Sequence, residues 1–283
     1  MKAATPELEA LLATRCFWVA DLWTVALASG SVLRHTSADQ AVIAGGRQFL
    51  ASSHLFERGR ISQKAGLEVA TLDLTVHPRE GDLVDGLPFL HAIRLGLFDE
   101  AEITLERAFM AEFGDTSAGT LIQFAGRAGE IEAGQSSAAI PVNSHLELLN
   151  VKLPRLVYQA SCPFTVFDGR CRLGRAAHEA AATVGSGASN TRVPLPDLAK
   201  ADGWATLGVL GFTSGLLAGL TRHVAAHSGG VLTVFPPLPS APAAGVSVRV
   251  AAGCAKTMEA CAAFGNLANY GGQPFVPAPE TAT

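Results

Sequence analysis

The sequence is poor in charge. Asp, Glu, Lys and Arg together make up 16% of its 283 residues, whereas about 25% is usual for a globular chain. The formal net charge is -4, with no block of like charges and no stripe of basic and aromatic residues. A general affinity for nucleic acid, including direct sequence-specific binding, is therefore not expected. With so few charged residues, much of the surface of a monomer would be uncharged. We therefore expect part of the surface to be buried against protein partners.

The beginning of the chain lacks the pattern of a secretory signal. Glu7 and Glu9 interrupt any apolar stretch that could form the core of a leader. Thr5 and Pro6 suit the N-cap and first turn of a helix, so we predict a short amphipathic helix from Pro6 to Ala13. We accordingly expect the chain to fold in a reducing cytoplasm, where stable disulfides are rare.

A membrane span is not expected either. Trp204 to Leu220 carries no charged residue over 17 positions, which is at the lower edge of a spanning length. Its four glycines would weaken a helix by about 1 kcal/mol each. The stretch therefore predicts two buried strands joined by a glycine-containing turn.

Enzyme motifs are missing as well. Gly211 to Gly215 is one residue off a nucleophile elbow, and no Asp or His partner can be placed for it. His223 and His227 have the spacing of a helical metal site, but no Glu lies between them and the context predicts a strand. Acidic residues offer no convincing pair for general acid–base chemistry. We therefore expect a protein that is not an enzyme.

Short apolar runs separated by turn residues predict a mainly β fold of the β-rich α+β class. Leu72, Leu74 and Val76 alternate with polar residues, so this strand would turn its apolar side chains toward a core. A hairpin is predicted around Gly126. We place an N-terminal antiparallel β domain at residues 1–153 and a C-terminal β domain at residues 154–283, with the boundary near Pro154.

Four of the five cysteines form two pairs in the second domain. Eight residues separate Cys162 from Cys171, six separate Cys254 from Cys261, and Cys16 stands alone far upstream. Spacing leaves four interpretations open: buried thiols, disulfides, structural zinc and an iron–sulfur cluster. Zinc usually takes tighter pairs, whereas a cluster accepts thiolates from separate loops, so spacing favours the cluster without deciding the matter.

The residues around the cysteines carry a family resemblance. Val250 to Pro277 contains Gly-Cys-Ala-Lys, a second Cys, then Phe-Gly-Asn, Asn-Tyr-Gly and Pro-Phe-Val-Pro. Cys162 to Cys171 reads Cys-Pro-Phe-Thr-Val-Phe-Asp-Gly-Arg-Cys. These stretches closely resemble the BR0599-like, or Gp84-like, hub proteins of phage and gene-transfer-agent tails, and the likeness spans nearly the whole chain. The two cysteine spacings also resemble those of the tail-tip protein L of phage lambda.

The resemblance implies a structural component of a phage-type tail tip or baseplate hub, at the tail tip of a virion and assembled in the cytoplasm of a bacterial host. Such a protein would form a homotrimer and link the distal tail ring to the central tip or fibre protein, near the tape-measure protein. Two alternatives remain: a stand-alone iron–sulfur redox or sensor protein, and a zinc-stabilised binding module.

The resemblance also implies a 4Fe–4S cluster that would staple the C-terminal domain. Its expected ligands are Cys162, Cys171, Cys254 and Cys261. Cys16 matches no ligand position, and we expect it to be an ordinary buried thiol.

Polar residues beside the cysteines could support such a site. Lys256 and Arg170 would either offset the charge of a four-thiolate cluster or simply be solvated. Asn266 and Asn269 would cap loops or bond main-chain groups. Ala255 stands where the family usually has Asp, which leaves the local hydrogen bonding there open.

Overall fold

The chain forms two compact units, Met1–Val151 and Lys152–Thr283, each built around its own β-sheet. The computed structural model describes residues 5–52, 55–63, 66, 68–151, 153 and 157–276. The boundary predicted between residues 153 and 154 lies close to the observed division, although Pro154 itself falls outside the described residues. Within those residues, no helix has the length and apolar character needed to cross a membrane.

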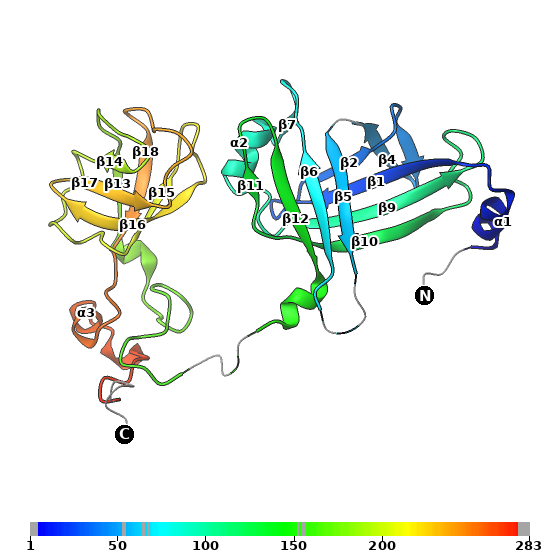
Figure 1. Cartoon of the computed structure of the whole chain (residues 1–283). Coiled ribbons are helices and arrows are strands. Elements are labelled where there is room, and N and C mark those ends of the chain that lie inside the picture. Colours follow the sequence, from blue (N-terminus) through cyan, green and yellow to red (C-terminus); the bar gives the residue numbers. More distant parts are fainter. Residues whose placement is uncertain are drawn as a thin grey trace. The chain divides into compact units, whose positions relative to one another are not determined.

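The N-terminal unit contains one long sheet and a few short helices (Figure 1). Its elements are α1 (Pro6–Thr14), β1 (Trp18–Ala26), β2 (Val32–Thr36), β3 (Val42–Ala44), β4 (Arg47–Ala51), β5 (Phe56–Ser62), β6 (Thr71–Val76), β7 (Leu83–Val84), β8 (Leu87–Pro88), α2 (Phe89–Arg94), β9 (Glu102–Met110), β10 (Thr120–Ala128), β11 (Glu132–Ala133), β12 (Ala138–Ser144) and a 3-10 helix (His145–Leu149). The strand order is β3-β4-β2-β1-β9-β10-β12-β6-β5, with β11 beside β12 and a separate β7–β8 pair. Among the described pairs, β2 with β4 runs parallel and the others are antiparallel.

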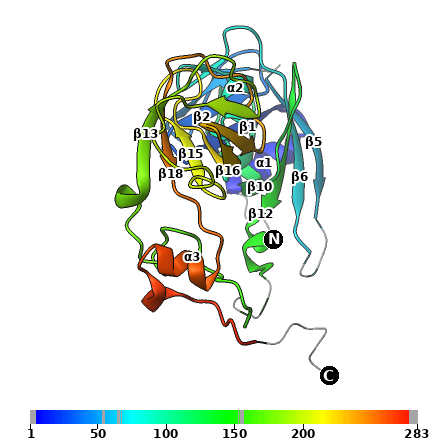
Figure 2. The same ribbon diagram turned by 90° about the vertical axis from the view of Figure 1, so that its left-hand side faces the viewer.

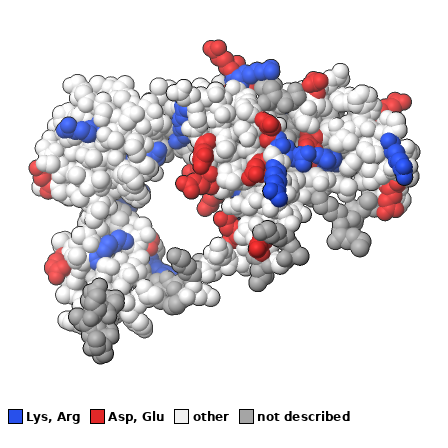
Figure 3. Space-filling view, viewed as in Figure 1, with Lys and Arg blue, Asp and Glu red and all other residues white. Residues whose placement is uncertain are grey.

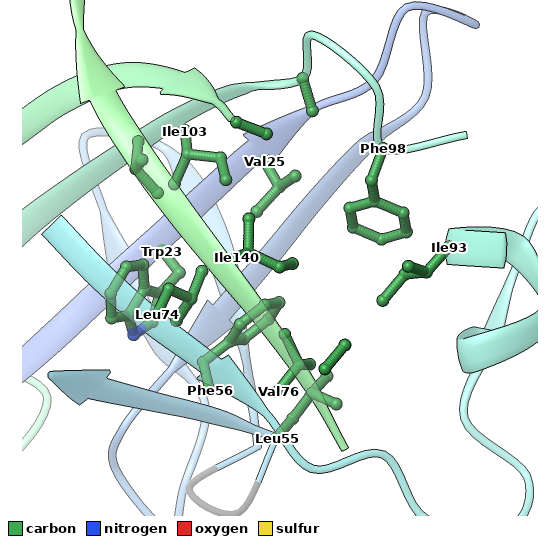
Figure 4. Close-up of a cluster of buried hydrophobic side chains, with 14 of the residues drawn as sticks. Trp23, Val25, Leu55, Phe56, Leu74, Val76, Ile93, Phe98, Ile103 and Ile140 are labelled. Atoms are coloured by element: carbon green, nitrogen blue, oxygen red, sulfur yellow. The ribbon is translucent and has the colours of Figure 1, made fainter. Parts of the chain in front are cut away.

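Alternating side chains build the core of this unit. Leu72, Leu74 and Val76 on β6 are buried, as their spacing predicts. They belong to one cluster with Trp23 and Phe56, whose rings stack with centroids 5.9 Å apart (Figure 4). The antiparallel β fold predicted for this half is therefore observed, and its core lies on one face of the sheet.

The β3–β4 hairpin covers part of the opposite face. Phe49 and Val42 from the hairpin pack in a second buried cluster with Leu22 of β1 and Met110 of β9. The hairpin also forms one edge of the sheet, and there Ile43 is 61% exposed. The edge strand therefore presents an apolar side chain to the outside.

The hairpin predicted around Gly126 is wrong. β10 runs through Gly126 without a turn and pairs with both β9 and β12. A Cβ at Gly126 would lie only 2.1 Å from the carbonyl oxygen of Asn143 on β12. Glycine here permits close approach of two strands, which is its other common role in a sheet.

The C-terminal unit has a six-stranded sheet of order β13-β18-β15-β16-β17-β14. Its elements are a 3-10 helix (Arg175–His178), β13 (Glu179–Thr183), β14 (Arg192–Pro194), β15 (Val209–Phe212), β16 (Thr221–Ser228), β17 (Val231–Phe235), β18 (Ser247–Ala251), α3 (Met258–Ala263) and a second 3-10 helix (Leu267–Asn269). Within this unit, Figures 1 and 2 place α3 beyond one end of the sheet, close to the loop that precedes β13.

Candidate metal centre

Asp168 shapes the loop that carries the first cysteine pair. Its carboxylate accepts hydrogen bonds from the backbone N–H groups of Thr165 at 3.0 Å, Arg170 at 2.9 Å and Cys171 at 2.6 Å. The bond from Cys171 is the largest cause of a lowered pKa for Asp168. An ionised Asp168 therefore fixes the turn that ends at Cys171.

The second pair begins where the chain leaves β18. Gly253 donates its backbone N–H to the carbonyl of Trp204 at 3.0 Å, just before Cys254. A Cβ at Gly253 would lie 1.6 Å from the carbonyl oxygen of Thr206. Only glycine fits at position 253, because any Cβ there would overlap the carbonyl group of Thr206.

Cys261 lies on α3 and is the most deeply placed of the four thiols. The side-chain oxygen of Thr257 accepts a hydrogen bond from the N–H of Ala260 at 3.2 Å and caps the helix. Cys261 in turn donates its N–H to the carbonyl of Thr257 at 3.1 Å. The cap therefore sets the start of α3 and, with it, the position of Cys261.

Lys256 joins one cysteine of the first pair to one of the second. Its carbonyl accepts a hydrogen bond from the N–H of Cys162 at 2.9 Å, and its own N–H donates to Sγ of Cys254 at 3.4 Å. Both bonds use the main chain of Lys256, so they depend on the path of the backbone rather than on the lysine side chain.

Asn266 joins the other two cysteines. Its side-chain Nδ2 donates to the carbonyl of Cys171 at 2.7 Å and lies 3.6 Å from Sγ of the same residue. Sγ of Cys261 donates to the backbone carbonyl of Asn266 at 3.2 Å. Cys171 and Cys254 are 83 positions apart (254 − 171), and these contacts bring both pairs into one region.

The four thiols also interact electrostatically. Burial raises the pKa of the Cys261 thiol, and the thiols of Cys254, Cys162 and Cys171 raise it further. The other three sulfurs are therefore close enough to Cys261 for their charges to act on it. Four thiolates gathered in this way would repel one another unless a cationic group neutralised them.

The exposure of the cysteines distinguishes them from ordinary core thiols. Cys162, Cys171 and Cys254 are only half-buried, and all five cysteines are free, whereas free cysteines in cores are among the most buried residues. The expectation of a buried Cys16 is wrong: it is exposed, because it lies in the short connection between α1 and β1.

Among the residues that the structure describes, no group of three or more His, Cys, Asp or Glu side chains is arranged so that it could hold a metal ion. The iron–sulfur staple is thus not a feature of the observed fold and remains a prediction. The donors themselves suit iron, since four thiols are the soft ligands that iron–sulfur chemistry selects. A cavity of about 610 Å³ reaches Cys254 and Lys256 beside Phe167 and His223, and a metal site needs such an entry path.

Sequence reasoning missed several residues that position the cysteines. Asp168 and Gly253 had no assigned role, although an Asp shortly before a turn commonly accepts backbone N–H bonds. The ammonium of Lys256 donates to the carbonyl of Phe164, and the guanidinium of Arg170 lies 5.8 Å from the Phe164 ring centroid. Both cations therefore hold the first cysteine loop and are not merely solvated.

Two family models match separate parts of the chain. The model described as baseplate hub protein, N-terminal attachment domain, matches residues 5–174, and the model described as phage conserved hypothetical protein BR0599 matches residues 203–280. The first span contains Cys162 and Cys171, and the second contains Cys254 and Cys261. The interactions described above therefore connect segments that belong to two different family models.

A solved structure described as "Virion of native gene transfer agent (GTA) particle" contains a chain of similar fold. It matches with a TM-score of 0.75 and 23% sequence identity, over 98% of this chain and 94% of that chain. No curated protein matches this chain in sequence. Because the first family model covers 170 residues (5–174) of 283, the chain belongs to the baseplate hub protein family of phage-like particles.

Proposed function

We propose that this chain is a non-catalytic structural part of a phage-type tail tip that links the distal tail ring to the central tip or fibre protein. It would act as a homotrimer at the tail tip of the virion, near the tape-measure protein, after assembly in the cytoplasm of the bacterial host. Membership of the baseplate hub family supports this role, as does the similar fold of a chain in the gene transfer agent virion.

The surface of the chain suits a protein that functions in an assembly. Charged side chains are sparse on the face in Figure 3, where white areas separate them. Trp18, Ile43 and Leu50 of the N-terminal unit are 60%, 61% and 53% exposed. Covering apolar surface contributes about 25 cal/mol per Å², so partner proteins would gain free energy by packing on these side chains.

The four cysteines would hold a 4Fe–4S cluster within this structural role. One observation carries this part of the proposal: two cysteine pairs from distant segments meet through the contacts of Lys256 and Asn266. When bound, the cluster supplies a cross-link between the segment before β13 and the segment after β18. The residues of the chain do the positioning, with Asp168 holding Cys171 and Thr257 setting the start of α3.

The structural role is tested by removing the chain from a strain that produces the particles. We expect tails without complete tips by electron microscopy, and in the intact particle we expect cross-links from this chain to the ring and tip proteins. Mass photometry of the purified chain should find trimers. Normal infectious tails that lack the chain would overturn the structural role.

The cluster is tested by purifying the full chain without oxygen. We expect brown protein with visible charge-transfer absorbance and equal amounts of iron and sulfide, lost in Cys254→Ser and retained in Cys16→Ser. Colourless protein with one bound zinc ion would refute the cluster and favour a zinc-stabilised module. A cluster whose redox cycling changes tail assembly would favour a redox or sensor role over a structural one.

A further inference from the structure

Asn266 is a buried polar residue at the point where the two cysteine pairs meet. Its exposed fraction is only 9%, and burial of an asparagine side chain destabilises the fold unless its amide is hydrogen-bonded. Both ends of its amide are engaged: Nδ2 donates to the carbonyl of Cys171, and Oδ1 accepts from Nδ2 of Asn269 at 2.7 Å. The neighbouring Asn269 therefore fixes which end of the Asn266 amide faces Cys171.

The second hydrogen atom of Nδ2 has a sulfur within reach. An amide nitrogen carries two N–H donors. One serves the Cys171 carbonyl at 2.7 Å, and Sγ of Cys171 lies 3.6 Å from the same nitrogen, which is a hydrogen-bonding distance for an atom as large as sulfur. The backbone of Asn266 meanwhile bonds Cys261, through its N–H to the Cys261 carbonyl at 3.0 Å and through its carbonyl to the thiol.

We propose that Asn266 is the positioning residue of the metal centre: it holds Cys171 against Cys261 and donates an N–H bond to the Cys171 sulfur when that sulfur binds iron. The inference rests on the proposed cluster. Lys256 also touches two cysteines, but through its main chain, so the side chain of Asn266 makes a contact that a substitution can remove.

Two consequences separate this role from a purely structural one. Hydrogen bonds to the ligand sulfurs help to set the reduction potential of a cluster. Donation to Cys171 favours the more electron-rich reduced state, so loss of the donor should make the potential more negative. Residues that orient metal ligands from outside typically change metal affinity by about 10- to 100-fold when mutated, and we expect cluster retention against a chelator to fall by this factor.

The test compares wild type with Asn266→Asp, which keeps the size and the acceptor for Asn269 but replaces the donor with a carboxylate oxygen. Asn190→Asp makes the same chemical change at an exposed position of the same unit and serves as the matched control. The anaerobically loaded full chains are titrated for reduction potential and challenged with an iron chelator. We expect faster cluster loss and a more negative potential in Asn266→Asp alone.

The outcomes separate the two proposals. A wild-type chain that binds no iron and sulfide overturns the proposed cluster itself. A loaded wild type whose potential and retention equal those of Asn266→Asp overturns the role of Asn266 and leaves the cluster standing. If Asn266→Asp does not fold, Asn269→Ala provides the measurement, because it removes the bond that orients the Asn266 amide. Unchanged retention in that variant would likewise refute the inference.

Discussion

Replacement of Gly253 by alanine tests whether the close approach of the loop at residues 204–208 organises the candidate metal centre. The added Cβ would lie 1.6 Å from the carbonyl oxygen of Thr206 and 2.8 Å from the backbone nitrogen of Gly208. Real Cβ contacts are essentially never under 3.0 Å, so the two backbones must separate by at least 1.4 Å (3.0 − 1.6). The hydrogen bond from Gly253 to Trp204, now 3.0 Å long, cannot survive such a shift.

The size of the effect follows from these two losses. Overpacking of a tightly fitted site costs about 1–3 kcal/mol, and loss of one hydrogen bond costs about 1 kcal/mol. We therefore expect local destabilisation of about 2–4 kcal/mol. Because each 1.4 kcal/mol is a factor of ten, amides that exchange by local opening should exchange roughly 30- to 700-fold faster.

Hydrogen–deuterium exchange of the full chain measures this directly, in peptides that cover residues 204–208 and 251–254. Gly169→Ala is the control, since an added Cβ at Gly169 meets nothing within 4 Å, and we expect its stability to change by less than about 0.5 kcal/mol. Gly253→Ala should also bind iron and sulfide less completely than the control. Equal exchange in the two variants would refute the idea that this contact positions Cys254.

Three further perturbations test the fold and the surface. The backbone N–H of Thr183 lowers the pKa of Asp197 below its ordinary 3.8. The stabilisation that Asp197 provides is thus complete above pH 3.8, the ordinary pKa of an aspartate. It is lost as the pH falls through the lower pKa that Asp197 has in the folded state. The difference in unfolding midpoint between wild type and Asp197→Asn should accordingly be largest near neutral pH and vanish in acid. Leu74→Ala should lower the free energy of unfolding in urea by about 2–5 kcal/mol, while the exposed Asp73→Asn should change it by less than about 0.5 kcal/mol. Ile43→Asp should leave the melting temperature unchanged but reduce incorporation of the chain into tails; equal incorporation would argue against this edge as a contact.

Strands with clear two-residue alternation could be predicted from the sequence. β6 has one buried and one solvated face, and its apolar residues fall on the buried face as their spacing requires. β17 (Val231–Phe235) has a related local pattern, since its largely apolar run is bounded by glycine and proline. Such local patterns predict a strand because its side chains alternate regularly between a buried and a solvated environment.

Glycines could not be interpreted in the same way. Gly126 resembles a turn signal in the sequence, yet Gly126 and Gly208 each permit another backbone to approach. A Cβ at Gly208 would lie 2.2 Å from the carbonyl of Ala251. A glycine that forms a turn and a glycine that permits close approach of two strands look the same in the sequence. The partner strand that distinguishes the two roles is distant along the chain.

The candidate site shows the same division between local and distant information. Flanking residues were sufficient to single out Cys162, Cys171, Cys254 and Cys261, because the motifs around them are local. Nothing in the sequence connects Asn266 with Cys171, 95 positions earlier. Contacts of this kind depend on how the two segments meet in space, which no spacing within either segment encodes.

The placement of the pairs around the sheet explains what a cross-link between them would stabilise. The first pair precedes β13 and the second follows β18, and these two strands are hydrogen-bonded neighbours. The start of β13 lies beside the end of β18, so the folded sheet already brings together the two segments that carry the pairs. In the unfolded chain the same link would close a loop of 83 residues (254 − 171). By analogy with a disulfide, closing such a loop restricts the unfolded chain by about 4–5 kcal/mol, so the cluster would stabilise this unit mainly by raising the free energy of its unfolded state.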